Sequence, residues 1–148
     1  MAVRVQTEDF DVGAESRALQ ADAVGAIALF VGTVRGLSSD NGVTAMTLEH
    51  YPGMTESELE RIEAEARARW PLEDVTIIHR VGRLEAGDQI VLVGAASAHR
   101  QAAFDAAQFI MDFLKTDAPF WKAEERGDET SWVDARESDD VARKRWTS

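Results

Sequence analysis

The sequence has 148 residues and a formal net charge of -11, from 16 basic and 27 acidic residues. This length is typical of one domain with a sizeable core, and we expect residues 1–148 to form a single domain. The acidic balance argues against a nucleic-acid surface and against binding to an anionic membrane. Because cysteine is absent, disulfides, cysteine nucleophiles and thiolate metal sites are excluded.

Two further absences narrow the class of protein. No apolar run approaches about 18 residues, and the N-terminal stretch MAVRVQTEDF lacks the apolar segment of a signal peptide. We therefore expect a cytoplasmic protein. His50, His79 and His99 show no HxxH or HExxH spacing, and neither a GxGxxG motif nor a P-loop is present. We expect no metal and no other cofactor.

Strand and helix signals alternate in the N-terminal half. An edge strand is predicted over 2–6, and a helix from Thr7 or Asp11 to about Ala21. The apolar run 25–35 (GAIALFVGTVR) predicts a central strand that delivers Arg35 to the polar loop 36–42. Gly32 within this run indicates a bulge or a close approach, or else simple sheet curvature. Another strand is predicted over 43–50.

The middle of the chain predicts a helix followed by two strands. Thr55 and Glu58 form a T-x-x-E capping box for a helix that ends near Trp70. Strands are predicted over 74–81 and 89–96, joined as a hairpin. His79 and Arg80 fall on the first of these strands, where we interpret them as pairing or interface residues.

The segment 97–124 predicts a helix of about 18 residues capped by Ser97. Its polar residues occupy both ends. His99 and Arg100 lie in the first turn, where free amides favour an anion, and Lys115 ends the helix. An apolar face follows from residues three and four apart, namely Ala102, Ala103, Ala106, Phe109, Ile110, Phe113 and Leu114.

An aromatic strand is predicted after Pro119, with Lys122 and Glu124 on one face because side chains alternate. A lysine among aromatic residues is partly desolvated, which suits proton transfer or nucleophilic chemistry. The alternative is structural: polar caps at the helix start, a solvated Lys115, and a Lys122 that reaches solvent from the strand. A last strand over 130–135 and a terminal helix capped by Ser138 complete the prediction.

The distance between the two ends of the long helix limits any shared site. His99 and Lys115 are 16 positions apart, which corresponds to roughly 24 Å along one helix. One copy of the helix cannot bring both residues to one small ligand. Either the helix breaks, or there are two anion sites, or a second subunit supplies one end.

The predicted order β-α-β-β-α-β-β-α-β-β-α indicates an α+β fold with a mainly antiparallel sheet and flanking helices. Several stretches together resemble the large, catalytic subunit of molybdopterin synthase. They are FVGTVR (30–35), LEHYPGMTE (48–56), HRVGRLEAGD (79–88), SAHRQAAFDAAQFIMDFLK (97–115) and PFWKAE (119–124).

This resemblance implies an α/β hammerhead-type subunit, active as a sulfurtransferase in molybdenum cofactor biosynthesis. It implies a homodimer that binds two copies of a small ubiquitin-like sulfur carrier, giving a heterotetramer. The C-terminal Gly-Gly thiocarboxylate of the carrier would supply two sulfurs, which convert cyclic pyranopterin monophosphate (precursor Z) to molybdopterin. The absence of cysteine is consistent with this reaction, because the sulfur arrives on the carrier.

The resemblance also implies site residues. Lys115 and Lys122 match the catalytic lysines, one acting as a general acid/base or polarising the thiocarboxylate, with Glu124 orienting Lys122. Relatives often carry another basic residue at Ala123, so we expect contact there through the backbone. The positions implied to bind substrate are Thr33, Val34, Arg35, His99, Arg100, Ala123, Glu124 and Arg136.

Combined with the helix length, these positions predict a composite site, in which His99 and Arg100 face lysines of the other subunit. The main rival is a non-catalytic module that binds a ubiquitin-like tail or a phosphorylated metabolite. A phosphoesterase is a weaker alternative, because the sequence shows neither metal ligands nor an activated nucleophile.

Overall fold

The computed structural model describes residues 2–36, 42–126, 129–133 and 137–147. The expected α+β content is confirmed, and the order of elements matches the prediction with one added strand, β5. The elements are β1 (Val3–Gln6), α1 (Val12–Ala18), β2 (Ala26–Thr33), β3 (Ala45–His50), α2 (Met54–Arg69), β4 (Leu72–Arg80), β5 (Gly82–Glu85), β6 (Gln89–Ser97), α3 (Arg100–Asp117), β7 (Phe120–Arg126), β8 (Glu129–Val133) and α4 (Glu137–Lys144).

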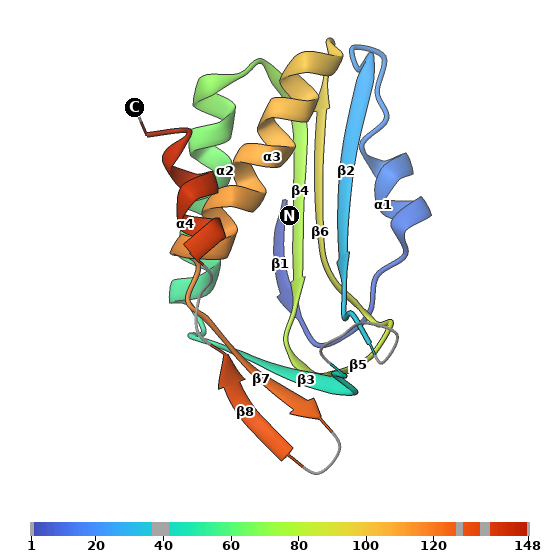
Figure 1. The fold of residues 1–148 in the computed structure, drawn as a ribbon. Helices are drawn as coiled ribbons and strands as arrows, with labels where there is room; N and C mark the ends of the chain where they lie inside the picture. Colours follow the sequence, from blue (N-terminus) through green and yellow to red (C-terminus); the bar gives the residue numbers. More distant parts are fainter. Residues whose placement is uncertain (1, 37–41, 127–128, 134–136, 148) are drawn as a thin grey trace.

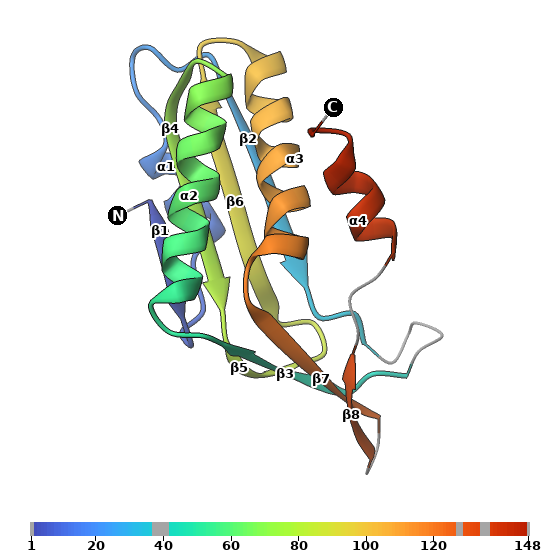
Figure 2. The same ribbon diagram turned by 90° about the vertical axis from the view of Figure 1, so that its left-hand side faces the viewer.

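The larger of two sheets has the strand order β1-β4-β6-β2. Strand β1 runs parallel to β4, and the β4–β6 and β6–β2 pairs are antiparallel. Helices α2 and α3 cover one face and α1 lies on the other (Figures 1 and 2). The main core lies between the sheet and the α2–α3 layer, where Ile77, Val93, Phe109 and Ile110 are all fully buried.

The smaller sheet has the order β5-β3-β7-β8, with antiparallel pairs throughout. It lies across one end of the larger sheet, at the end where α3 finishes and β7 begins (Figure 1). This is the hammerhead-type arrangement that the resemblance implies. Because the chain passes from α3 into β7 through Ala118 and Pro119 alone, Lys115 and Lys122 lie close to the junction between the sheets.

Strand β2 lies at the edge of its sheet, which corrects the prediction of a central strand. Among the described strands only β6 pairs with it, and it ends at Thr33, before Arg35. Leu29 and Phe30 remain 37% and 41% exposed. The prediction is wrong because a continuous apolar run is equally compatible with an edge strand that leaves part of its apolar surface uncovered.

Gly32 lies both at a β-bulge and at a close approach between strands, the two features that the sequence indicated. The register of the β2–β6 pair shifts between Gly32 and Thr33, which is a bulge. A Cβ atom at Gly32 would also lie 2.8 Å from Cγ1 of Val91, closer than such atoms can approach. A side chain at this position would therefore require the Val91 side chain or the strand backbone to shift.

Helix α2 starts two residues earlier than the predicted Thr55–Glu58 box requires. The Glu56 carboxylate accepts the Gly53 N–H at 3.0 Å, while the buried Thr55 hydroxyl donates to the Tyr51 carbonyl at 2.8 Å. Gly53 has a φ of 83°, a conformation in which glycine lets the chain turn directly into the helix. The capping pair is therefore displaced to Gly53 and Glu56.

The strands predicted as a hairpin, β4 and β6, do pair with each other, but their connection contains β5. Strand β5 pairs with β3 in the smaller sheet. A strand of four residues whose partner lies far away in the sequence has no local signal, which explains why the prediction omits it.

Helix α3 is continuous from Arg100 to Asp117, and its predicted apolar face is buried. Ser97 does not cap it. Ser97 is the last residue of β6, where it pairs with both neighbouring strands and donates its hydroxyl to the Pro71 carbonyl at 2.9 Å. Because the sheet holds Ser97, the N-cap falls on His99, whose side chain makes no capping hydrogen bond.

The ends of helices α1 and α4 differ slightly from the prediction. Asp11 caps α1 by accepting the Ala14 N–H at 3.0 Å, and this helix ends at Ala18 rather than near Ala21. Helix α4 begins at Glu137, so Ser138 lies inside it and is not its cap. It packs beside α3 (Figure 2). Of the predicted strand 130–135, the last two residues lie outside the described ranges.

Candidate active site at the junction of the two sheets

The two lysines occupy either side of the turn from α3 to β7. Lys115 is in the last turn of α3, and its side chain is exposed. Lys122 is half-buried on β7, opposite Leu48 of β3. Burial within this chain therefore affects Lys122, whereas Lys115 is exposed in the isolated subunit, as the structural alternative of a solvated Lys115 predicts.

Glu124 is buried and shares a face of β7 with Lys122, as the alternation predicts. Its carboxylate accepts a hydrogen bond from Arg126 at 3.0 Å, which keeps a negative charge fixed two positions from Lys122. Ala123 faces the opposite side, buried between Thr47 and Trp132 of the adjacent strands. On the Lys122 side, a contact at this position would have to come from its backbone, and this contact stays a prediction.

The residues that follow β2 reach the same end of the molecule as the lysines. Val34 is buried in the core of the smaller sheet, and its backbone is bonded at 2.9 Å to Asp88 and at 2.8 Å to Gly87. Thr33 and Arg35, on either side of it, are exposed. Val34 therefore acts as an anchor that leaves the Arg35 cation at the surface of the junction.

His99 and Arg100 lie at the other end of α3, and both are exposed. Because α3 is continuous, the first of the three alternatives, a broken helix, is excluded. Two separate anion sites or a second subunit remain. Arg136, the last of the implied substrate-binding positions, lies outside the described residues.

Two histidines that the sequence did not select lie beside the lysines. The His79 ring, 5% exposed at the end of β4, stacks on the Phe120 ring at 3.8 Å between centroids, with 17° between the planes. His50, opposite Phe120 in the β3–β7 register, lies 6.5 Å from the same ring. Its Nδ1 atom is buried and finds no hydrogen-bond partner among the described residues.

His79 is held as a neutral imidazole. Its Nδ1 atom lies 2.8 Å from the Arg80 carbonyl, which can only accept, so Nδ1 carries the proton. The pKa of His79 is lowered from 6.5 to about 4, mainly by burial and to a smaller extent by the charges of Lys115 and His50, against the opposing effect of the Arg80 carbonyl. His79 is therefore uncharged near neutral pH and lies within electrostatic reach of Lys115.

Arg80 behaves as the pairing residue that the sequence predicts. Its guanidinium donates to the Thr7 carbonyl at 3.2 and 3.1 Å and to the Gln89 carbonyl at 2.9 Å. These bonds join the ends of three neighbouring segments. They hold the end of β4, and with it His79, in a fixed position.

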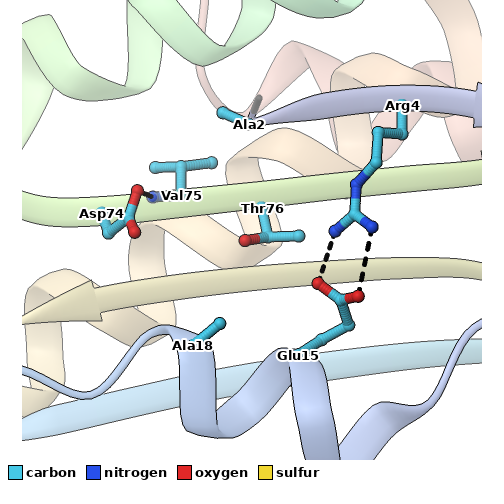
Figure 3. Close-up of a pocket in the computed structure, with 7 residues that line it drawn as sticks. All are labelled: Ala2, Arg4, Glu15, Ala18, Asp74, Val75 and Thr76. Atoms are coloured by element: carbon cyan, nitrogen blue, oxygen red, sulfur yellow. Dashed lines mark hydrogen bonds and ion pairs between the residues drawn. The ribbon is translucent and has the colours of Figure 1, made fainter.

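A separate cavity of about 370 Å³ lies on the α1 side of the larger sheet (Figure 3). Arg4 crosses it to form an ion pair with Glu15 of α1. None of the implied site residues that the structure describes lines this cavity. Since its only described cation is already paired with a carboxylate, the cavity does not resemble an anion site.

Known proteins resemble the chain along almost its whole length. The family model described as "MoaE protein" matches residues 5–117. The chain belongs to the MoaE protein family. A relative from Pseudomonas aeruginosa, named molybdopterin synthase catalytic subunit, is 55% identical over 148 residues, which is 99% of each chain.

Solved structures of the MoaE family agree with the fold. A MoaE protein from Burkholderia ambifaria has a TM-score of 0.84 at 54% identity, covering 99% of this chain and 98% of that chain. A protein-protein complex of subunits 1 and 2 of the molybdopterin-converting factor from Helicobacter pylori has a TM-score of 0.77, covering 92% of each chain. At 19% identity, the latter shows the fold alone.

The described residues contain neither a candidate metal site nor a candidate membrane-spanning helix. No group of three or more histidine, aspartate or glutamate side chains is arranged to hold a metal ion. Among the helices described, none has the length and apolar character needed to span a membrane.

Proposed function

We propose that residues 1–148 form the large-subunit domain of a molybdopterin synthase, a sulfurtransferase of molybdenum cofactor biosynthesis. The observation that carries the proposal is full-length similarity to proteins named as the catalytic subunit of this enzyme. The substrate is precursor Z, which receives two sulfurs as a dithiolene. The geometry at the α3–β7 turn supports this, because two lysines and Arg35 occupy one end of the fold.

The two lysines differ in environment, and this suggests a division of roles. Lys122 is half-buried beside the fixed Glu124 carboxylate, a setting suited to a group that holds or moves a proton at the pterin carbons. Lys115 is exposed at the end of α3, where a flexible ammonium can meet the thiocarboxylate of an incoming carrier. A bound carrier would remove water from Lys115 and strengthen its electrostatic effect.

The partner in this proposal is a small ubiquitin-like subunit whose C-terminal Gly-Gly thiocarboxylate carries the sulfur. The complex of two subunits from Helicobacter pylori, although distant in sequence, is consistent with such a partner. Because this chain has no cysteine, it cannot form a persulfide, so both sulfurs must be delivered by another molecule. The cytoplasmic location expected from the sequence stays a prediction.

We further propose a homodimer, within a heterotetramer, in which each site is composite. No described strand pairs with the outer edge of β2, and Phe30 is exposed on the face that α3 covers. Antiparallel pairing of two β2 edges about a twofold axis would place two α3 helices side by side in opposite directions. His99 and Arg100 of one subunit would then lie near Lys115 of the other. Within one subunit the same residues are separated by roughly 24 Å along the helix.

A reconstitution tests the proposed activity. The purified protein is mixed with thiocarboxylated small subunit and precursor Z, and the dithiolene product is assayed by fluorescence after oxidation. We expect product with the wild-type protein, and a loss of at least about 100-fold for Lys115→Ala and for Lys122→Ala. Near-wild-type turnover of both variants with saturating carrier would refute the role of the lysines.

The same assay distinguishes the rival function. A non-catalytic module would bind the carrier tightly, and the complete mixture would still give no product. As a matched control, Lys144→Ala removes an exposed lysine of α4, and we expect turnover to stay unchanged.

A further inference from the structure

One partner of the His79–Phe120 stack, Phe120, lies between the two lysines along the chain. Phe120 is five residues after Lys115 and two residues before Lys122, and it is the first residue of β7. Its ring lies flat against His79, which belongs to the other sheet. The stack is therefore a direct contact between the two sheets at the point where the chain passes from Lys115 to Lys122.

The His79 side of this contact is rigid. The ring is buried, its Nδ1–H donates to the Arg80 carbonyl at 2.8 Å, and Arg80 is bonded in turn to two other segments. A ring held by packing and by one hydrogen bond has few alternative orientations.

The Phe120 side depends on this contact. Only Ala118 and Pro119 separate α3 from β7, and the backbone bond from the Phe120 N–H to the Ala118 carbonyl, 2.9 Å, closes a tight turn. Phe120 and Lys122 lie on the same face of β7, because side chains alternate. The surface that Phe120 rests on therefore sets the distance of the Lys122 face from β4.

We propose that His79 is a positioning residue for the sulfur-transfer reaction, which fixes the separation of Lys115 and Lys122 by stacking on Phe120. This inference rests on the proposed function of the two lysines. His79 does not act on the substrate itself. It holds β7 at the angle at which the ammonium groups of Lys115 and Lys122 can contact the same reacting atoms. A displacement of about 1 Å in such a site can lower turnover about 100-fold.

The aromatic ring of His79 supplies the flat surface on which Phe120 rests, and this is the property that the positioning role needs. The hydrogen bond from its Nδ1–H to the Arg80 carbonyl adds to the fixed orientation of the ring. The low pKa of His79 is consistent with this role, since a second cation beside Lys115 would repel it.

The test compares three variants in the reconstituted assay. His79→Leu and Phe120→Leu remove the stack, whereas His79→Phe keeps an aromatic ring. We expect each leucine variant to lower kcat at least about tenfold, with KM for precursor Z and carrier affinity within about threefold of wild type. The double variant should be no slower than the slower single one, because both changes break the same contact. His79→Phe should restore kcat to within about threefold of wild type.

A distance measurement provides a readout that does not need activity. Since the chain has no cysteine, Lys115→Cys with Lys122→Cys gives two unique sites for spin labels. We expect a narrow distance distribution in this background and in the His79→Phe background. Adding His79→Leu should broaden the distribution about twofold or shift its mean.

Val75→Ala is the matched control, because it weakens the same buried face of β4 without contacting Phe120. If His79→Leu lowers melting temperature and turnover only as Val75→Ala does, or leaves kcat and the label distribution unchanged, the inference is wrong. A wild-type protein that makes no product, or lysine variants with full activity, would instead refute the proposed function. In that case the label distances alone would still decide whether His79 sets the spacing.

Discussion

Arg143 of α4 donates to the Asp117 carboxylate at 2.8 Å, which ties the C-terminal helix to the last residue of α3. Arg61 of α2 reaches the same carboxylate at 3.0 Å. Burial alone would raise the pKa of Asp117, but the hydrogen bonds from Arg143 and Thr116 outweigh it and hold the pKa below its ordinary value of 3.8. Three helices therefore meet at one negative charge, two residues from Lys115.

Asp117→Asn should lower the free energy of unfolding by about 1 kcal/mol at pH 7, since the partners are partly exposed. The wild-type advantage should persist above the ordinary pKa and disappear as the pH falls through the lower folded pKa. Urea unfolding of wild type and Asp117→Asn at pH 7 and pH 3 measures the difference in the free energy of unfolding and its loss at low pH. Glu58→Gln, which removes the other partner of Arg61, is the control, with an expected change below about 0.5 kcal/mol.

His79 predicts a second pH dependence of stability. Its folded pKa of about 4 lies below the ordinary value of 6.5, so the unfolded chain binds more protons between these values. The contribution of His79 to the free energy of unfolding should be fully present above pH 6.5. Between pH 6.5 and pH 4 the free energy of unfolding should fall by about 1.4 kcal/mol per pH unit. The comparison is urea unfolding of wild type and His79→Phe over this range. Equal slopes for the two proteins would show that His79 does not titrate in this way.

The composite site predicts complementation between inactive dimers. When His99→Ala and Lys115→Ala proteins exchange subunits at equal concentrations, half of the dimers are mixed, and each mixed dimer has one intact site. We expect about a quarter of wild-type turnover. Mixing Lys115→Ala with Lys122→Ala should give no recovery, because both lysines of a site come from one subunit. No recovery in the first mixture, despite proven exchange, would mean that each site lies within one subunit.

The exposed edge of β2 predicts how the dimer forms. Phe30→Lys places a charge on the apolar surface that we expect a second copy to cover, so the variant should be monomeric at concentrations where wild type is dimeric. Light scattering coupled to size exclusion measures this. Met54→Lys changes another exposed apolar residue, on α2, and should leave the dimer intact. A dimeric Phe30→Lys protein would place the interface elsewhere.

Much of the site is predictable because its residues are close in sequence. Lys115 and Lys122 flank a single turn, so a helix that ends before Pro119 and a strand after it bring them to one place. The same helix, by its length alone, separates His99 from Lys115. The role of Ser97 is not predictable in this way, since a good capping residue is equally able to bond within a sheet, and its partner Pro71 lies far away in the chain.

The sequence by itself determined the periodic elements, above all α3 and the alternation along β7, because a period of 3.6 or 2 is a property of neighbouring residues. It also determined the chemistry available, with no thiol and with 16 basic residues outnumbered by 27 acidic ones. Only the tertiary structure decided that β2 is an edge strand, that β5 crosses to the other sheet, and that His79 stacks on Phe120. Each of these depends on which distant segments become neighbours, and that is settled by the packing of the whole core rather than by any local pattern.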